Sequence, residues 1–163
     1  MVRGIVVVTR YENKGLKNML KYRKLYLDSF DLNSPAKEGD AGFDLCSYET
    51  KVLPVGIPTE ISTGVAIELP PGSVGLVVGR SGLAFKNHIT VFHVGTIDSG
   101  YRGEIKVLLL NIGTQDYTIN PGDKIAQLLV LSLEQSAYRY KASEVEVFSD
   151  SVRGETGFGS TGK

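Results

Sequence analysis

Short runs of β-branched and apolar residues recur along the chain, and Pro or Gly residues bound most of them. Turn signals such as Leu69-Pro-Pro-Gly72 and Asn120-Pro-Gly-Asp123 separate these runs. Many short strands with regularly spaced turns are typical of a β-sandwich, a jelly roll or a barrel. We therefore predict an all-β fold, with strands at Ile5–Thr9, Ile61–Leu69, Val74–Gly79, Ile89–Val94, Glu104–Ile112 and Lys124–Glu134.

A helical period is indicated only at Lys14–Tyr26, with one further helical turn near Leu83–Lys86. The apolar runs Leu108–Leu110 and Leu128–Leu131 predict strands buried on both faces, either in the middle of a sandwich or against another subunit. We predict one β domain over residues 1–150, in which residues 10–39 form a charged, irregular connection or insertion. A flexible C-terminal arm is predicted over residues 151–163.

The composition narrows the class of partner. The 163 residues include 18 basic and 18 acidic side chains, so the formal net charge is zero. This balance provides no broad basic field for nucleic acid, although a few local arginines suffice for a small anionic molecule. The single cysteine, Cys46, excludes an internal disulfide, and no apolar run approaches the length that spans a bilayer. We expect a cytoplasmic protein with no membrane or nucleic-acid partner.

Two segments combine glycine with charged side chains. Asp44 follows a glycine in Ala41-Gly-Phe-Asp44-Leu, where its carboxylate either holds a metal ion or its waters, or caps a turn. The segment Gly79-Arg80-Ser81-Gly82 ends a predicted strand and opens a helical turn. At a strand end that leads into a helix, exposed N–H groups, a hydroxyl and a guanidinium can together bind an anion. The alternative is an ordinary turn with an exposed arginine, which explains the segment equally well.

Two later segments place polar side chains beside hydrophobic strands. Gly95 and Gly100 predict a tight hairpin with Asp98 and Tyr101 near its tip. Asp98 could position a water there and the Tyr101 ring could pack against a sugar, or the segment is an ordinary surface turn. Gln127 lies among apolar neighbours, so its amide needs hydrogen-bond partners from the backbone or from a ligand. His88 and His93 have no ligand-spaced partner and are interpreted as structural or exposed.

The C-terminal eleven residues, from Arg153 to Lys163, contain four glycines and almost nothing apolar. Such a tail cannot bury enough surface to hold a structure alone. Its glycines, hydroxyls and arginine suit a phosphorylated ligand, and Phe158 offers a flat face for a base. A solvated terminus is the alternative.

Together, the segments AGFDL, GRSGLA, GTIDSGYRGE, GDKIAQL and RGETGFGSTG resemble, in order and nearly letter for letter, the five motifs of the homotrimeric deoxyuridine triphosphatases (dUTPases). The resemblance covers the chain from about residue 36 to its end. It implies a jelly-roll-like β fold, a homotrimer, and Mg²⁺-dependent hydrolysis of dUTP to dUMP and pyrophosphate. That reaction keeps uracil out of DNA and supplies dUMP for thymidylate synthesis.

The resemblance also implies roles for individual residues. Asp44 would help to organise Mg²⁺ through water, and Asp98 would orient the attacking water and accept its proton. Tyr101 would pack under the deoxyribose. Uracil would be read by the backbone of Gly95, Thr96 and Ile97, with Lys106 near the substrate.

The triphosphate would be bound by residues of three motifs. Phosphate contacts are implied for Arg80, Ser81, Gly82 and Gln127. From the tail, Arg153, Gly159, Ser160 and Thr161 would close on the terminal phosphates, and Phe158 would stack on the base. Three departures from the family form are Thr156, where a second consecutive glycine is usual, Phe92, where many members carry an asparagine, and a first 35-residue segment longer than that of a minimal member.

Two other functions compete with this one. dCTP deaminases share the fold, but their pattern has a glutamate, the general base, in the strand after the hairpin. This chain has Leu108 at that position, so the resemblance argues against deamination. A regulatory or binding protein built on the dUTPase fold is the second alternative, and residues 10–39 would then contact an unidentified protein partner.

Overall fold

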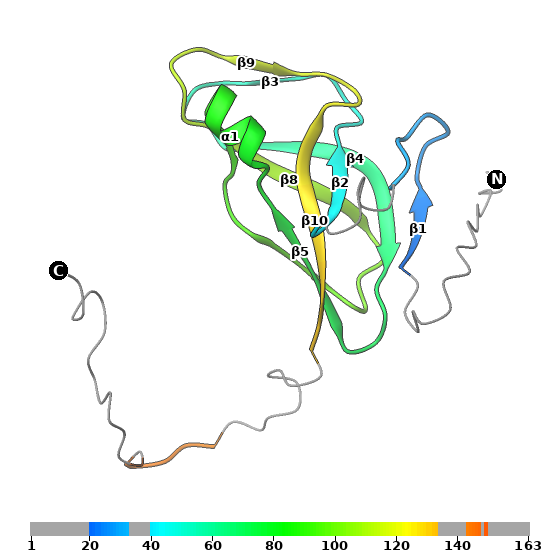
Figure 1. Ribbon diagram of the computed structural model, residues 1–163, viewed down its shortest axis with the longest axis vertical. Helices are drawn as coiled ribbons and strands as arrows, with labels where there is room; N and C mark the ends of the chain where they lie inside the picture. The colour runs from blue at the N-terminus through cyan, green and yellow to red at the C-terminus, as the bar shows by residue number, and fades with distance from the viewer. Residues whose placement is uncertain (1–19, 33–39, 134–142, 148, 150–163) are drawn as a thin grey trace.

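Two four-stranded antiparallel sheets share one core in this computed structural model, which describes residues 20–32, 40–133, 143–147 and 149 (Figure 1). The first sheet has the order β1 (Lys21–Lys24), β4 (Thr59–Glu68), β8 (Glu104–Asn111) and β6 (Ile89–Val91). The second has the order β2 (Phe43–Cys46), β10 (Lys124–Ser132), β5 (Ser73–Val78) and β7 (Gly95–Asp98). A two-stranded sheet of β3 (Lys51–Leu53) and β9 (Tyr117–Ile119) and one helix, α1 (Ser81–Asn87), complete the described part.

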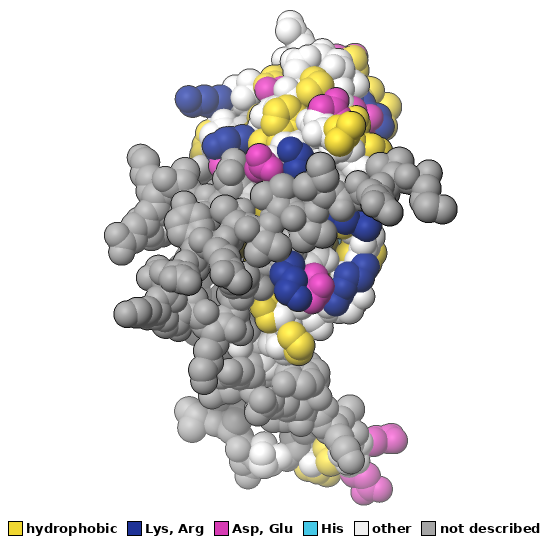
Figure 2. Space-filling view, turned by 90° about the vertical axis from the view of Figure 1, so that its right-hand side faces the viewer, with side chains coloured by type: hydrophobic (Ala, Val, Ile, Leu, Met, Phe, Trp, Pro, Cys, Tyr) yellow, Lys and Arg dark blue, Asp and Glu magenta, His cyan; other side chains and the backbone are white. Residues whose placement is uncertain are grey.

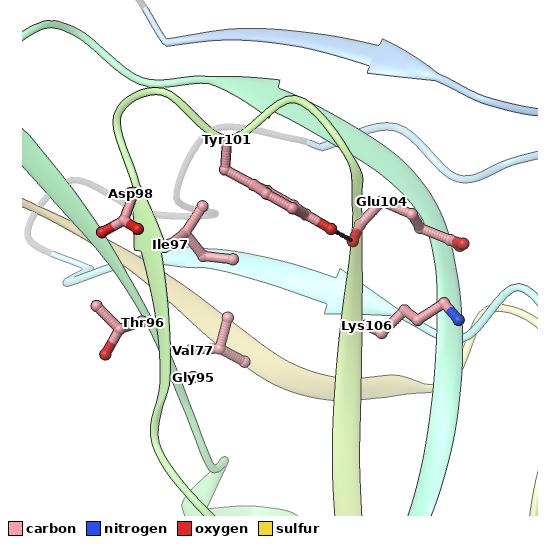
Figure 3. A pocket seen from close by; sticks show the side chains of 8 residues that line it. All are labelled: Val77, Gly95, Thr96, Ile97, Asp98, Tyr101, Glu104 and Lys106. Atoms are coloured by element: carbon pink, nitrogen blue, oxygen red, sulfur yellow. Dashed lines mark hydrogen bonds between the residues drawn. The ribbon is translucent and has the colours of Figure 1, made fainter.

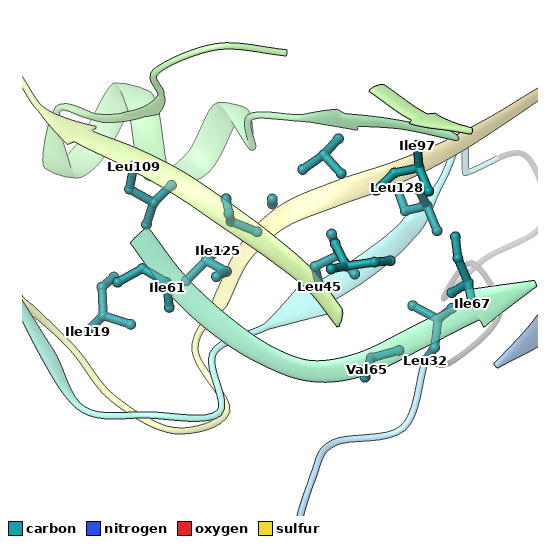
Figure 4. Packing of buried hydrophobic residues seen from close by; sticks show 14 of the residues in the cluster. Leu32, Leu45, Ile61, Val65, Ile67, Ile97, Leu109, Ile119, Ile125 and Leu128 are labelled. Atoms are coloured by element: carbon teal, nitrogen blue, oxygen red, sulfur yellow. The ribbon is translucent and has the colours of Figure 1, made fainter. Parts of the chain in front are cut away.

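The core lies between the inner faces of the two large sheets (Figure 4). Along β8, buried residues alternate with more exposed ones, as the period of two in a strand requires. Ile61 and Leu109 of the first sheet and Leu45 and Leu128 of the second are all at most 1% exposed. Burying such side chains contributes roughly 1.5–3 kcal/mol each, so this interdigitated layer stabilises the sandwich.

The structure confirms the mostly β, jelly-roll-like fold and the strands predicted at Ile61–Leu69, Val74–Gly79, Glu104–Ile112 and Lys124–Glu134, the last of which ends at Ser132. The predicted Ile89–Val94 strand ends at Val91, after which the chain crosses to the other sheet as β7. The strand predicted at Ile5–Thr9 lies outside the described residues, as does the C-terminal arm. In the described part, no helix is long and apolar enough to cross a membrane.

The helix predicted at Lys14–Tyr26 is wrong where the structure describes it, because Lys21–Lys24 forms β1. This strand pairs antiparallel with β4, and the backbone hydrogen bonds of an open sheet edge outweigh a weak helical period. The helical turn predicted near Leu83–Lys86 is confirmed as α1, which ends at His88 in the left-handed conformation with φ 57°.

The hairpin predicted around Gly95 and Gly100 is also corrected. β7 pairs with β5, whereas β8 pairs with β4 and β6, so the turn joins the two sheets instead of two paired strands. The sequence shows the glycine turn but not the partners of each strand, because pairing is set by contacts distant in the chain.

The two apolar runs each have one face turned outward within this chain. Leu109 and Leu128 are fully buried, but Leu108 is 37% and Leu131 45% exposed. Burial on both faces is therefore wrong for the single chain. The alternative of a subunit interface stays a prediction.

Charges of both signs lie next to each other on the described surface (Figure 2). Ion pairs join neighbouring strands of the first sheet, with Lys21 Nζ 2.9 Å from Glu68 Oε1 and Lys106 Nζ 2.7 Å from Glu60 Oε1. These exposed pairs contribute at most about 1 kcal/mol each.

Candidate active site

A pocket of about 270 Å³ lies where β7 turns into β8 (Figure 3). Six residues predicted for the site line it: Gly95, Thr96, Ile97, Asp98, Tyr101 and Lys106. Val77 and Glu104 complete the lining, and the sequence reasoning assigned no role to either. The structure thus brings together the residues expected to read a base, a sugar and a water.

The turn that closes this pocket is fixed by hydrogen bonds from within. Tyr101 N donates to Asp98 O at 3.0 Å, and Arg102 Nη1 donates to Ser99 O at 2.7 Å. Tyr101 Oη donates to Glu104 O at 2.9 Å, which holds the ring across the pocket although Tyr101 is 44% exposed. The ring lies over Gly103, where an added Cβ would come within 2.4 Å of the hydroxyl. Only glycine at position 103 leaves room for this ring orientation.

β7 presents its two faces differently. Ile97 is 9% exposed and belongs to the core, whereas Thr96 and Asp98 are exposed. Figure 3 shows Thr96 and Asp98 pointing to the side of β7 away from Lys106, as alternation along a strand requires. β7 is also the edge strand of its sheet, so one side of its backbone is available for hydrogen bonds to a ligand.

Lys106 projects from β8 beside the pocket and is held by Glu60 of β4. The hydrogen bond to the Glu60 carboxylate, together with the charge of that group, raises the pKa of Lys106 above its ordinary value. Lys106 is therefore a cation at neutral pH, at the edge of the pocket where the sequence predicted it.

A second cluster of predicted residues lies at the other end of β5. Asp44 of β2 forms two ion pairs. Its Oδ2 lies 2.8 Å from Lys124 Nζ, and its Oδ1 lies 3.1 Å from Arg80 Nε. Gln127 is the register partner of Asp44 on β10. Arg80 Nη1 also donates to Lys124 O at 3.2 Å. The cluster therefore groups one acid, two cations and an amide.

The cations control the ionisation of Asp44. Partial burial raises the pKa of this carboxyl, but the hydrogen bond from Lys124 and the charges of Arg80 and Lys124 outweigh it, so the pKa is lowered overall. The Arg80 N–H is not aligned with the oxygen 3.1 Å away, and neither atom has another hydrogen-bond partner. Their contact is an ion pair without a directed hydrogen bond.

Local geometry explains why glycine precedes this cluster. A Cβ on Gly42 would meet Leu128 O at 2.7 Å, so β2 approaches β10 only because position 42 has no side chain. Ser81 and Gly82 form the exposed start of α1, immediately after Arg80. Sequence reasoning missed Lys124, although it stands in the GDKIAQL segment. Its role becomes visible only when β10 is placed beside β2.

Asp98 and Arg80 are far apart within one chain, although the two clusters adjoin where Val77 of the pocket precedes Val78, the register partner of Gln127. Asp98 is opposite Val74 in the β5–β7 register, and Arg80 follows Val74 by six residues. At about 3.3 Å per residue, the span is roughly 20 Å. The five tail residues Arg153, Phe158, Gly159, Ser160 and Thr161 lie outside the described residues.

The fold and both clusters define a β protein with the parts of a nucleotide-binding site, and comparison with known proteins gives the family. The dUTPase family model matches residues 28–162, and the chain belongs to the dUTPase family. It is 46% identical over 144 residues to the deoxyuridine 5'-triphosphate nucleotidohydrolase of Clostridium acetobutylicum, covering 88% of this chain and 96% of that protein. The Clostridioides difficile protein of the same name is also 46% identical, with 88% and 97% covered.

Solved structures show the same relationship. The dUTPase of Staphylococcus bacteriophage 80alpha, bound to dUPNHPP, superimposes with a TM-score of 0.82 at 30% identity over 90% of this chain and all of that one. The dUTPase of phage phi11 of S. aureus, in which a structural Mg(II) ion is coordinated, gives a TM-score of 0.71 at 30% identity, covering 80% of this chain and 99% of that one.

Proposed function

We propose that this protein is a Mg²⁺-dependent dUTP diphosphatase that hydrolyses dUTP to dUMP and pyrophosphate in the cytoplasm. The observation that carries the proposal is the pocket between β7 and β8, lined by the GTIDSGYRGE residues that a uracil nucleotide would use. The activity would keep uracil out of DNA and supply dUMP for thymidylate synthesis.

Uracil would bind along the free edge of β7. The backbone of Gly95–Ile97 would match the O4 acceptor and the N3–H donor of uracil, and cytosine would leave these groups unpaired. Discrimination of this kind reaches about 10⁴-fold when buried polar groups are left without partners. Tyr101 would pack under the deoxyribose, where its fixed ring would reject a ribose hydroxyl.

Asp98 would hold the attacking water for the α-phosphate. An aspartate carboxylate is a weak base at neutral pH, so the main role of Asp98 would be to orient the water and to accept the proton late. The exposure of Asp98 on the outer side of β7 supports a role toward a ligand outside its own core.

The phosphate chain would lie at the second cluster. Arg80 and Gln127 would contact phosphate oxygens, together with Ser81 and Gly82 at the start of α1. Electrostatic groups of this kind stabilise the charge that develops as pyrophosphate leaves.

The residues fit Mg²⁺ only in an indirect way. The described residues contain no group of three or more His, Cys, Asp or Glu that could hold a metal. In the second cluster the carboxylate is that of Asp44, with Lys124 and Arg80 beside it. A single carboxylate suits contact with Mg²⁺ through water, with the nucleotide supplying the direct oxygens. Bound there, Mg²⁺ would neutralise charge on the reacting phosphate.

We further propose a homotrimer with active sites shared between subunits. One nucleotide cannot bring Asp98 and Arg80 of the same chain together across roughly 20 Å of strand, but facing subunits can supply one residue each. The outward faces of Leu108 and Leu131 provide apolar surface for such contacts.

The tail would complete the site as a flexible arm. Arg153, Gly159, Ser160 and Thr161 would bind the terminal phosphates, and Phe158 would stack on the base. Removal of residues 151–163 is expected to abolish most turnover while leaving the trimer folded. Turnover equal to that of the full chain would contradict this role.

A panel of nucleotides tests the function. The purified protein is incubated with dUTP, dCTP, dTTP and UTP in Mg²⁺, and pyrophosphate and the base of each product are measured. Pyrophosphate release from dUTP alone is expected. Uracil formed from dCTP would show a deaminase instead, and no reaction with any of the four would refute the proposal.

A further inference from the structure

Glu104 reaches from the pocket into an irregular part of the neighbouring strand. Its register partner on β4 is Ala66, while Lys106, two residues on, pairs with Ser62, so β4 holds two extra residues at this place. The extra residues form a bulge around Gly64, which has φ 68°. Residues in a bulge leave the regular ladder, and their backbone groups need other partners.

The Glu104 carboxylate is that partner. Its Oε1 accepts hydrogen bonds from Gly64 N at 2.7 Å and from the Ser62 hydroxyl. Gly64 is buried, so its N–H would be left without water if the carboxylate were removed. Hydrogen bonds to a charged acceptor are about twice as strong as neutral ones, which makes this a firm anchor.

The bulge itself is fixed from the other side. Gly64 O accepts a hydrogen bond from Leu25 N at 2.8 Å, and a Cβ on Gly64 would come within 2.4 Å of Ser29 Oγ. Thr63 Oγ1 donates to Ile105 O at 2.6 Å, next to Glu104. The Gly64 peptide is therefore held between the segment after β1 and the start of β8, and it provides a rigid support for the Glu104 side chain.

The main chain of the same residue holds the pocket ring. Glu104 O is the acceptor for Tyr101 Oη at 2.9 Å, shown by the dashed line in Figure 3. The absence of a side chain at Gly103 leaves room for the ring in this orientation. Fixing Glu104 through its carboxylate thus also fixes the carbonyl that orients Tyr101.

We infer that Glu104 is a positioning residue: its carboxylate, bound in the β4 bulge, sets the orientation of Tyr101 and with it the discrimination of the sugar. The inference rests on the proposed function for its catalytic consequence, but the link between Glu104, Gly64 and Tyr101 is a property of the fold alone.

Three variants test the link. Glu104→Ala removes the acceptor, and Glu104→Gln keeps an amide oxygen that can accept both hydrogen bonds. Glu68→Ala is the matched control, because Glu68 is also a carboxylate of this sheet but pairs with Lys21 at 2.9 Å, away from the pocket. Thermal unfolding first establishes which variants fold. If Glu104→Ala does not fold, Ser62→Ala replaces it, because this change removes one of the two hydrogen bonds to the Glu104 carboxylate and is expected to move the same signals.

The first readout needs no activity. Nuclear magnetic resonance of the full chain follows the Gly64 amide and the Tyr101 ring, which is assigned with Tyr101→Phe. Both signals are expected to move in Glu104→Ala and to stay near wild type in Glu104→Gln and Glu68→Ala. A Tyr101 ring signal unchanged in Glu104→Ala would overturn the inference even if dUTP hydrolysis is confirmed.

The second readout is the preference for dUTP over UTP. Glu104→Ala is expected to lower this ratio of kcat/KM roughly tenfold, mostly through KM, because a misplaced ring loses binding that is present before and during the reaction. Glu104→Gln should restore most of it. An unchanged ratio in a less stable Glu104→Ala would mean that the carboxylate only stabilises the fold. Equal loss in both variants with an unmoved Tyr101 signal would mean direct substrate contact.

Discussion

Mixing two inactive variants tests whether the site is shared between subunits. Asp98→Asn removes the group that orients the water, and Arg80→Ala removes a phosphate ligand. Within one chain Asp98 is the register partner of Val74, and Arg80 comes six residues after Val74, which is roughly 20 Å of extended backbone. A shared site takes Asp98 from one subunit and Arg80 from its neighbour. In the mixture such a site is intact only when an Arg80→Ala chain supplies Asp98 and the neighbouring Asp98→Asn chain supplies Arg80.

The expected recovery follows from random assembly. In an equal mixture, each required residue is present with a probability of about one half, so about one quarter of the sites are intact. The two variants are co-expressed with different tags, mixed oligomers are purified through both tags, and pyrophosphate release from dUTP is measured. Selecting mixed oligomers raises the intact fraction to about one third in a trimer.

A double variant provides the control. The control mixes Asp98→Asn chains with chains that carry both Asp98→Asn and Arg80→Ala. No two subunits of this mixture can supply an intact Asp98 and an intact Arg80 together, so it should stay inactive. If native mass spectrometry shows mixed trimers of the two single variants without any recovered activity, the shared-site reasoning is refuted.

Three further perturbations follow from the site. Asp98→Asn should lower kcat roughly 10³-fold with a nearly unchanged KM, measured by steady-state pyrophosphate release; a loss only in KM would contradict the role of Asp98 toward water. Gly103→Ala should displace the Tyr101 ring, because its Cβ would come within 2.4 Å of Tyr101 Oη, and should weaken the preference for dUTP over UTP at unchanged trimer assembly. Asp44→Asn should cost about 1 kcal/mol of unfolding free energy near neutral pH. Because Lys124 and Arg80 lower the pKa of Asp44 in the folded state, this difference should fade as pH drops below the ordinary value of about 3.9, and a constant difference from pH 7 to pH 3 in thermal unfolding would contradict it.

The sequence predicted the long strands well because their signal is local. Val107 and Leu109 of β8 recur with the period of two that a half-buried strand requires, and the turns around them carry Gly or Pro. Short strands such as β3 and β9 were missed, since three residues carry too little pattern to recognise. β1 was mistaken for a helix because its stability comes from pairing with β4.

The candidate site was predicted as residues but not as an arrangement. The resemblance pointed to Asp98, Tyr101 and Lys106, and the structure places all three on one pocket. The sequence did not reveal Lys124 beside Asp44 or Glu104 in the β4 bulge, because both contacts cross between strands far apart in the chain. Their discovery depended on strand register, which local patterns do not contain.

The fate of the water oxygen tests the central claim most directly. dUTP is hydrolysed by the full-length protein in heavy-oxygen water (H₂¹⁸O) with Mg²⁺, under single-turnover conditions, and the products are weighed by mass spectrometry. Attack on the α-phosphate by a water held at Asp98 predicts one heavy oxygen in dUMP and none in pyrophosphate. Heavy oxygen in pyrophosphate, or dUTP left intact by the folded protein, would contradict the account.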